Sequence, residues 1–134
     1  EGTTVTKGLE LSGEYAVSDR LSLSGNYTYT IAENDGARLA RVPRHQLLLA
    51  ADFDVTDRLT AGVAATHVSD VLDGFGTLTP LDDYTVVDLT TRYDLTDTTS
   101  AYLTVRNLTD ETYETARGYN TSERALYVGI QADF

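Results

Sequence analysis

Apolar and polar residues alternate along most of this chain, which is the pattern expected of half-buried β-strands. The clearest case is residues 21–31, where Leu, Gly, Tyr and Ile alternate with Ser, Asn and Thr. The same period of two recurs in six further segments, at residues 9–17, 45–55, 59–65, 87–95, 101–105 and 124–134. The sequence therefore predicts an all-β fold of about seven strands.

Short and long connections alternate between these segments. Three are tight turns built on a Ser-Asp or Thr-Asp pair, at Asp19, Asp57 and Asp97, where side chains can hydrogen-bond the local backbone. The long connections are residues 32–41, 69–83 and 109–123. The turns recur about every 40 residues, so one hairpin plus one long loop is the repeating unit. This arrangement predicts an antiparallel, up-and-down transmembrane β-barrel segment with short periplasmic turns and long extracellular loops.

Other β architectures also alternate, namely a soluble β-sandwich or a soluble barrel that binds a small ligand. Two features favour the membrane barrel. The face opposite the apolar one is mostly Ser, Thr, Asn, Asp, Glu and Arg, which suits a wet lumen, and tyrosines fall near strand ends, where an interfacial aromatic girdle would lie. These tyrosines are Tyr15, Tyr29, Tyr84, Tyr93 and Tyr113. A complete small outer-membrane barrel with a structural or adhesive role is a further alternative, but such bacterial barrels have an even number of strands, eight or more.

The composition excludes several classes of binding partner and site. The 134 residues include 21 Asp and Glu against 10 Lys and Arg, a formal net charge of -11 that would repel nucleic acid. The absence of Cys excludes a disulfide framework and a thiolate metal site. No apolar run approaches the roughly 18 residues of a membrane-spanning helix, whereas a barrel strand needs only about 9 to 11. We expect no nucleic-acid partner and no cofactor.

Carboxylates gather in the second long loop, at Asp70, Asp73, Asp82 and Asp83. Calcium would use such oxygen ligands, but the Asp-x-Asp-x-Asp-Gly spacing is absent, so a solvated outer loop is favoured over a metal site. Two carboxylates could also hydrolyse a glycoside, yet nothing in the sequence fixes their separation. No nucleophile motif such as G-x-S-x-G is present. We therefore expect no catalytic residue, no metal ligand and no enzyme activity.

Two segments near the C-terminus resemble a known family. NLTDETYE at 107–114 and GYNTSERALYVGIQADF at 118–134 are similar to the end of TonB-dependent outer-membrane receptors, in which an Asn-Leu-x-Asp-x-x-Tyr segment follows the penultimate strand. The ending is most similar to the vitamin B12 (cobalamin) receptors. Segments 7–30, 41–70 and 81–96 resemble that barrel in the same order, so the resemblance covers nearly all of the chain.

The resemblance implies that residues 1–134 are the C-terminal part of a plugged barrel of about 22 strands, whose plug domain and earlier strands are absent here. It implies energy-coupled uptake of a large, scarce nutrient, cobalamin or an iron-siderophore, across the outer membrane of a Gram-negative bacterium. The implied partners are outer-membrane lipid, the remaining strands and plug, a TonB-type coupling protein acting through the plug, and the barrel-assembly machinery. An isolated copy is expected to self-associate through its open strand edges.

The resemblance also assigns roles to individual residues. An aromatic C-terminal residue after alternating apolar positions resembles the signal read by the assembly machinery, carried here by Leu126, Val128, Ile130 and Phe134. Any contact with substrate is expected in the long loops, because aromatic and Arg side chains supply most contact energy at binding surfaces. The candidates are Phe75, Tyr113, Arg117 and Tyr119.

Overall fold

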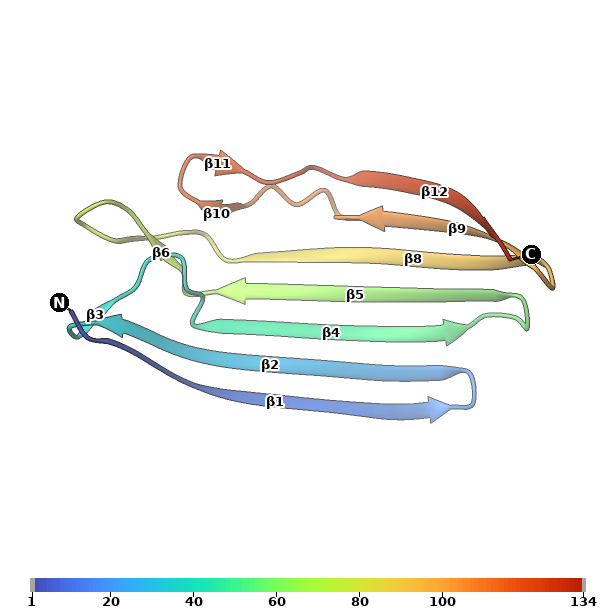
Figure 1. Ribbon diagram of the computed structural model, residues 1–134, viewed down its shortest axis with the longest axis horizontal. Coiled ribbons are helices and arrows are strands. Elements are labelled where there is room, and N and C mark those ends of the chain that lie inside the picture. The colour runs from blue at the N-terminus through green and yellow to red at the C-terminus, as the bar shows by residue number, and fades with distance from the viewer. Residues whose placement is uncertain (1, 134) are drawn as a thin grey trace.

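The computed structural model describes residues 2–133 and consists there of β-strands, turns and loops. Seven long strands form one antiparallel sheet in which the strand order follows the sequence (Figure 1). They are β1 (Thr4–Ser18), β2 (Leu21–Asn34), β4 (His45–Asp54), β5 (Leu59–Ser69), β8 (Tyr84–Thr96), β9 (Thr99–Arg106) and β12 (Ala125–Ala132). The predicted all-β class and the predicted number of long strands are confirmed.

Five short strands lie in the long connections, and the alternation pattern did not predict them. β3 (Ala37–Arg38) pairs with the end of β2, β6 (Leu72–Asp73) pairs with β7 (Thr79–Pro80), and β10 (Glu114–Ala116) pairs with β11 (Tyr119–Asn120). The first hairpin is also longer than predicted, since β1 and β2 pair out to Thr4 and Asn34. Backbone pairing needs no alternation of side chains, so these polar strand ends gave no signal.

The register of the sheet joins the apolar positions of neighbouring strands into continuous rows. Residues directly opposite each other in a sheet lie on the same face. One row crosses all seven strands through Tyr15, Leu23, Ala51, Val63, Leu89, Val105 and Leu126. The next row, on the other face, runs through Ala16, Ser22, Asp52, Gly62, Thr90, Thr104 and Tyr127. The first surface is the apolar face of the sheet and the second is its polar face.

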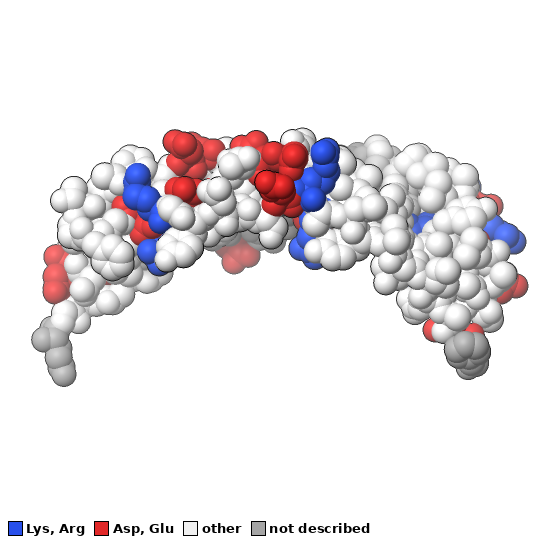
Figure 2. Space-filling view, turned by 90° about the horizontal axis from the view of Figure 1, so that it is seen from above, with Lys and Arg blue, Asp and Glu red and all other residues white. Residues whose placement is uncertain are grey.

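The apolar face is largely uncovered. The accessible surface is 9360 Å², whereas a compact protein of this mass would expose about 6,900 Å². Large side chains of the apolar face stand open, including Leu49 at 53% and Val128 at 72%. Figure 2 shows the molecule curved into an arch that is hollow on one side. No helix among residues 2–133 is long and apolar enough to cross a membrane.

The three tight turns close in the same way. The hydroxyl oxygens of Ser18, Thr56 and Thr96 each accept the backbone N–H two residues later, at 3.2, 3.2 and 3.3 Å. This confirms the predicted side-chain-to-backbone bonds, with Ser or Thr rather than the following Asp as the acceptor. A bond of 2.7 Å from Arg20 to Asp57 joins two neighbouring turns. These turns lie together at one end of the sheet, the turn end (Figure 1).

The predicted aromatic girdle is only partly correct. Register places Tyr15, Tyr29 and Tyr93 on the apolar face, as expected. Tyr84 lies instead on the polar face, opposite Val68, and its ring stacks on Tyr113 with centroids 4.2 Å apart. Those two rings therefore pack within the protein rather than in the girdle, because Tyr84 has the opposite strand parity from Tyr93.

Candidate functional site

The three long loops gather at the end of the sheet opposite the tight turns, the loop end (Figure 1). In the second loop, residues 70–83, the β6–β7 hairpin folds against the neighbouring strands. Val68, Val71 and Leu81 are buried there, and Tyr84 packs against them. The Leu81 N–H donates to the Val71 carbonyl at 2.9 Å. This small apolar cluster fixes the base of the hairpin.

Asp73 lies at the centre of the loop end with only 2% of its surface exposed. Its carboxylate accepts hydrogen bonds from Arg41 Nε at 2.9 Å, from the backbone N–H of Arg117 at 2.6 Å and from the N–H of Gly74 at 2.9 Å. The Arg117 N–H, followed by the Arg41 guanidinium, lowers the pKa of Asp73 below its usual value. The expectation of a solvated loop is wrong for Asp73, because groups from all three loops surround it.

Asp70 makes a second, shallower connection between the loops. Arg38 donates to its carboxylate and to its backbone carbonyl, both at 2.8 Å, while Arg44 Nε lies 3.6 Å from the other carboxylate oxygen. The hydrogen bond from Arg38 is the main reason that the pKa of Asp70 is lowered. Acidic and basic side chains gather over the loop-end half of the arch in Figure 2. Within residues 2–133, no group of three or more His, Cys, Asp or Glu side chains is arranged to hold a metal ion.

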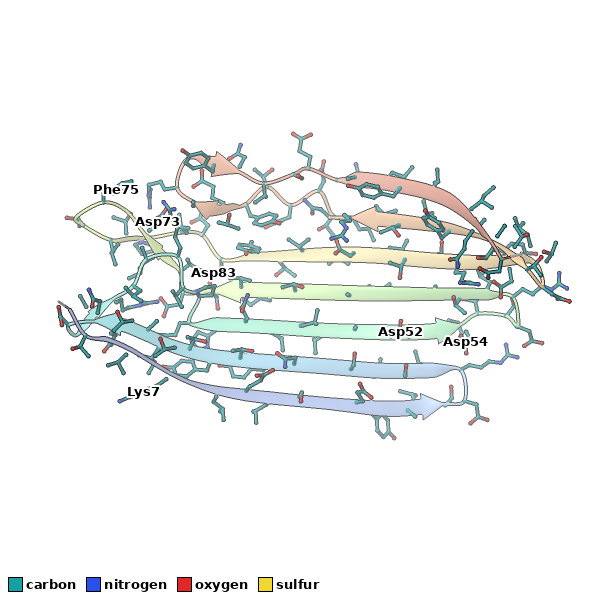
Figure 3. All side chains as sticks on the ribbon, in the orientation of Figure 1. Lys7, Asp52, Asp54, Asp73, Phe75 and Asp83 are labelled. Carbon is teal, nitrogen blue, oxygen red and sulfur yellow. The ribbon has the colours of Figure 1, made fainter. Side chains whose placement is uncertain are left out.

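The four substrate-contact candidates divide into two pairs. Arg117 donates to the Thr79 hydroxyl at 2.6 Å and to the Pro80 carbonyl at 3.0 Å, and Tyr113 stacks on Tyr84. Phe75 is 100% exposed and Tyr119 is 72% exposed. Figure 3 shows Phe75 at the outer end of the loop between β6 and β7, next to Asp73. A role in contacting substrate stays a prediction for all four, but only the second pair presents free rings.

Asn107 fixes the backbone at the start of the third loop through hydrogen bonds, a role that the sequence did not reveal. It is 4% exposed and has a φ of 51°. Its N–H donates to Asp88 at 2.9 Å, its side-chain amide donates to the Glu111 and Ser122 carbonyls, and its side-chain oxygen accepts the Glu111 N–H at 2.8 Å. The segment that carried the family resemblance thus begins with a residue that holds both ends of its loop.

The polar face carries separate contacts between charged or polar side chains. Arg92 donates to Asp94 at 3.0 Å, and Asn26 donates to Glu10 at 2.8 Å. Asp52 and Asp54 lie at the far end of β4, close to the turn end (Figure 3). These groups suit a wall that faces water.

The predicted assembly residues lie on the apolar face of β12. Leu126, Val128 and Ile130 are 66%, 72% and 71% exposed. Phe134 lies outside the described residues. Recognition by the assembly machinery stays a prediction.

Comparison with known proteins connects this geometry to a family. Residues 1–108 match the family described as TonB dependent receptor-like, beta-barrel. The chain is 32% identical over 130 residues to the ferrioxamine B receptor of Salmonella typhimurium (strain LT2), covering 86% of this chain and 18% of that protein. A 54-residue stretch is 44% identical to the vitamin B12 transporter of Vibrio cholerae, covering 40% of this chain and 9% of that protein.

A solved structure agrees with these matches. The pyoverdine outer membrane receptor FpvA from Pseudomonas aeruginosa, bound to pyoverdine, superposes with a TM-score of 0.81 at 26% identity. The match covers 98% of this chain and 22% of that one. The chain therefore spans about a fifth of the length of these relatives, apart from the shorter match to the vitamin B12 transporter.

Proposed function

Because this chain belongs to the TonB-dependent receptor β-barrel family, we propose that it forms the C-terminal part of the barrel of a receptor that takes up a large, scarce nutrient. Its location is the outer membrane of a Gram-negative bacterium. The observation that carries the proposal is the apolar row that crosses all seven strands beside a polar row. One face suits lipid and the other suits a wet lumen, as in transmembrane barrels.

The nutrient we propose first is an iron-siderophore. The match to the ferrioxamine B receptor extends over 86% of this chain, whereas the match to the vitamin B12 transporter extends over 40%. Cobalamin is the second candidate, favoured by the higher identity of that shorter match and by the resemblance of the last strand. Both are large ligands, and both would be bound by the loops before entering the lumen.

The remaining parts of the proposal follow from family membership. Residues 1–134 act as one barrel segment, and the rest of the receptor supplies the plug domain and the earlier strands. The matched relatives are transport receptors rather than enzymes. We propose that a TonB-type protein drives uptake through the plug and that the assembly machinery recognises the β12 end of the barrel. Phe75, Tyr113, Arg117 and Tyr119 remain the proposed ligand contacts.

Uptake by intact cells tests this proposal. The complete receptor that contains this chain is expressed in a strain lacking its own siderophore and cobalamin receptors. Accumulation of radiolabelled ferric ferrioxamine B, ferric ferrichrome and cyanocobalamin is then measured with and without the TonB-type protein. We expect one ligand to accumulate only when that protein is present. Accumulation of none of them, from a receptor shown to be in the outer membrane, would favour a structural or adhesive barrel.

A further inference from the structure

We infer that Asp73 is a positioning residue that joins the β6–β7 and β10–β11 hairpins, so that the exposed rings of Phe75 and Tyr119 form one rigid contact surface. The inference rests on the proposed function in one respect, namely that the loop end binds the ligand. The joining of the hairpins itself stands on contacts within the chain.

Three hydrogen bonds donated by Arg117 join the two hairpins. Asp73, at the end of β6, accepts the backbone N–H of Arg117 at 2.6 Å, across 44 residues of sequence. The Arg117 guanidinium also donates to Thr79 at 2.6 Å and to Pro80 at 3.0 Å, both in β7. Arg117 of the β10–β11 hairpin thus supplies every donor, and the β6–β7 hairpin supplies every acceptor. Separation of the hairpins would break all three bonds.

The same short pattern occurs in both hairpins. Asp73 is followed by Gly74 and then by the exposed Phe75, and Arg117 is followed by Gly118 and then by the exposed Tyr119. Both glycines have positive φ, 146° for Gly74 and 79° for Gly118, a conformation that L side chains rarely adopt. In each hairpin an anchored residue is therefore connected to an exposed ring through one glycine turn.

The chemistry at position 73 requires a carboxylate. Its Oδ1 accepts from Arg41 and Gly74, and its Oδ2 accepts from Arg117. Asparagine has one acceptor oxygen, so it would satisfy one of these two sets and place its amide hydrogens against the donor of the other. Burial of the carboxylate would be unfavourable without a counter-charge, and Arg41 supplies it.

The arrangement suits a ligand with a planar or apolar face. Aromatic rings bind such faces by stacking, and rings whose positions are fixed in advance lose less entropy when the ligand binds. Packing within the chain does not explain the positions of Phe75 and Tyr119, because the two side chains are 100% and 72% exposed. A joint contact surface explains why both exposed rings are attached to the same buried carboxylate.

Amide hydrogen exchange on the complete receptor in detergent tests the joining of the hairpins. With Asp73→Asn we expect the Arg117 amide to exchange roughly tenfold faster or more, since a bond to a buried carboxylate is lost. Asp82→Asn changes an exposed carboxylate in the same loop and should leave that amide unchanged. If Asp73→Asn fails to insert, Thr79→Val removes one of the two acceptors of the Arg117 guanidinium without changing size and should give a smaller acceleration. Unchanged exchange in both inserted variants would overturn the inference.

Ligand affinity tests the positioning role. For the probe that wild type takes up, among ferric ferrioxamine B, ferric ferrichrome and cyanocobalamin, Asp73→Asn should weaken binding about 3- to 10-fold. The same change in a Phe75→Ala, Tyr119→Ala background should cause no further loss, because the rings carry the effect. A loss of equal size in that background would show that Asp73 acts elsewhere. If wild type binds none of the probes, the proposed function fails, while the exchange experiment still decides whether the hairpins are joined.

Discussion

Adjacent leucines in β4 offer a direct test of which face of the sheet meets lipid. Leu48 and Leu49 are similarly exposed, at 42% and 53%, but point to opposite faces. Leu49 lies between Gly25 and Ala65 on the apolar face, whereas Leu48 lies between Asn26 and Thr66 on the polar face. Leu49→Arg is therefore expected to destabilise the barrel strongly, and Leu48→Arg only weakly.

The size of the effect follows from depth in the membrane. Residue 49 is near the middle of a strand that runs from His45 to Asp54, so its side chain lies near the bilayer midplane. Arginine on the lipid face at that depth costs about 2–4 kcal/mol, a shift in the folding equilibrium of roughly 30- to 700-fold. Leu49 also packs over Gly25, with its Cδ2 3.2 Å from the place where a Cβ would stand, and that contact is lost as well. On a water-facing wall the same substitution costs roughly 0.5 kcal/mol or less.

Refolding of the complete receptor into lipid vesicles provides the assay. The folded fraction is followed through a urea titration by the mobility of unheated samples on gels, for wild type, Leu49→Arg, Leu48→Arg and a Leu49→Ala control. The control separates lost packing from the introduced charge. Equal losses in the two arginine variants, or a larger loss for Leu48→Arg, would refute the assignment of the apolar face to lipid.

Two further predictions concern the last hairpin and the loop end. Gly129→Ala should cost about 0.5–1 kcal/mol, because a Cβ would overlap the Tyr102 ring that covers this glycine. Gly13→Ala, where a Cβ meets nothing within 4 Å, should be neutral or slightly stabilising, and urea midpoints compare the two. Acid should loosen the loop end, since the pKa values of Asp70 and Asp73 are lowered from 3.8 and their charged forms stabilise the folded loops above that pH. A spin label introduced through Phe75→Cys should keep constant mobility from about pH 7 to about pH 5. It should become more mobile below pH 3.8, because protonation of the two carboxylates removes this stabilisation. Increased mobility of the label near neutral pH would contradict this prediction.

The sequence predicted the two faces of the sheet because strand parity is a strict rule. Once neighbouring strands pair in register, every second residue must share a face, so the alternation around Leu49 determined its side of the wall. The tight turns at Ser18, Thr56 and Thr96 were predictable for a similar reason, since their bonds reach only two or three residues along the chain.

The loop end could not be predicted because its contacts are long-range and follow no period. Asp73 meets Arg41 and Arg117 across 32 and 44 residues, and in sequence it is one carboxylate in an acidic loop. The β6 and β7 strands have two residues each, too few for any alternation to show. Asn107 contributed to a family resemblance, but its φ of 51° and its bonds across the loop have no counterpart in the pattern of residue types.

The three hydroxyl-closed turns make the wall modular. They stand 38 and 40 residues apart, at positions 18, 56 and 96, and each long strand pairs with its neighbours in sequence. A duplicated or deleted unit of this length would add or remove one hairpin and leave the register of the other pairs unchanged. Because barrel diameter grows with strand number, such events would change the width of the lumen in whole steps of two strands. A barrel built from such units can change the diameter of its lumen through gene duplication without a new fold.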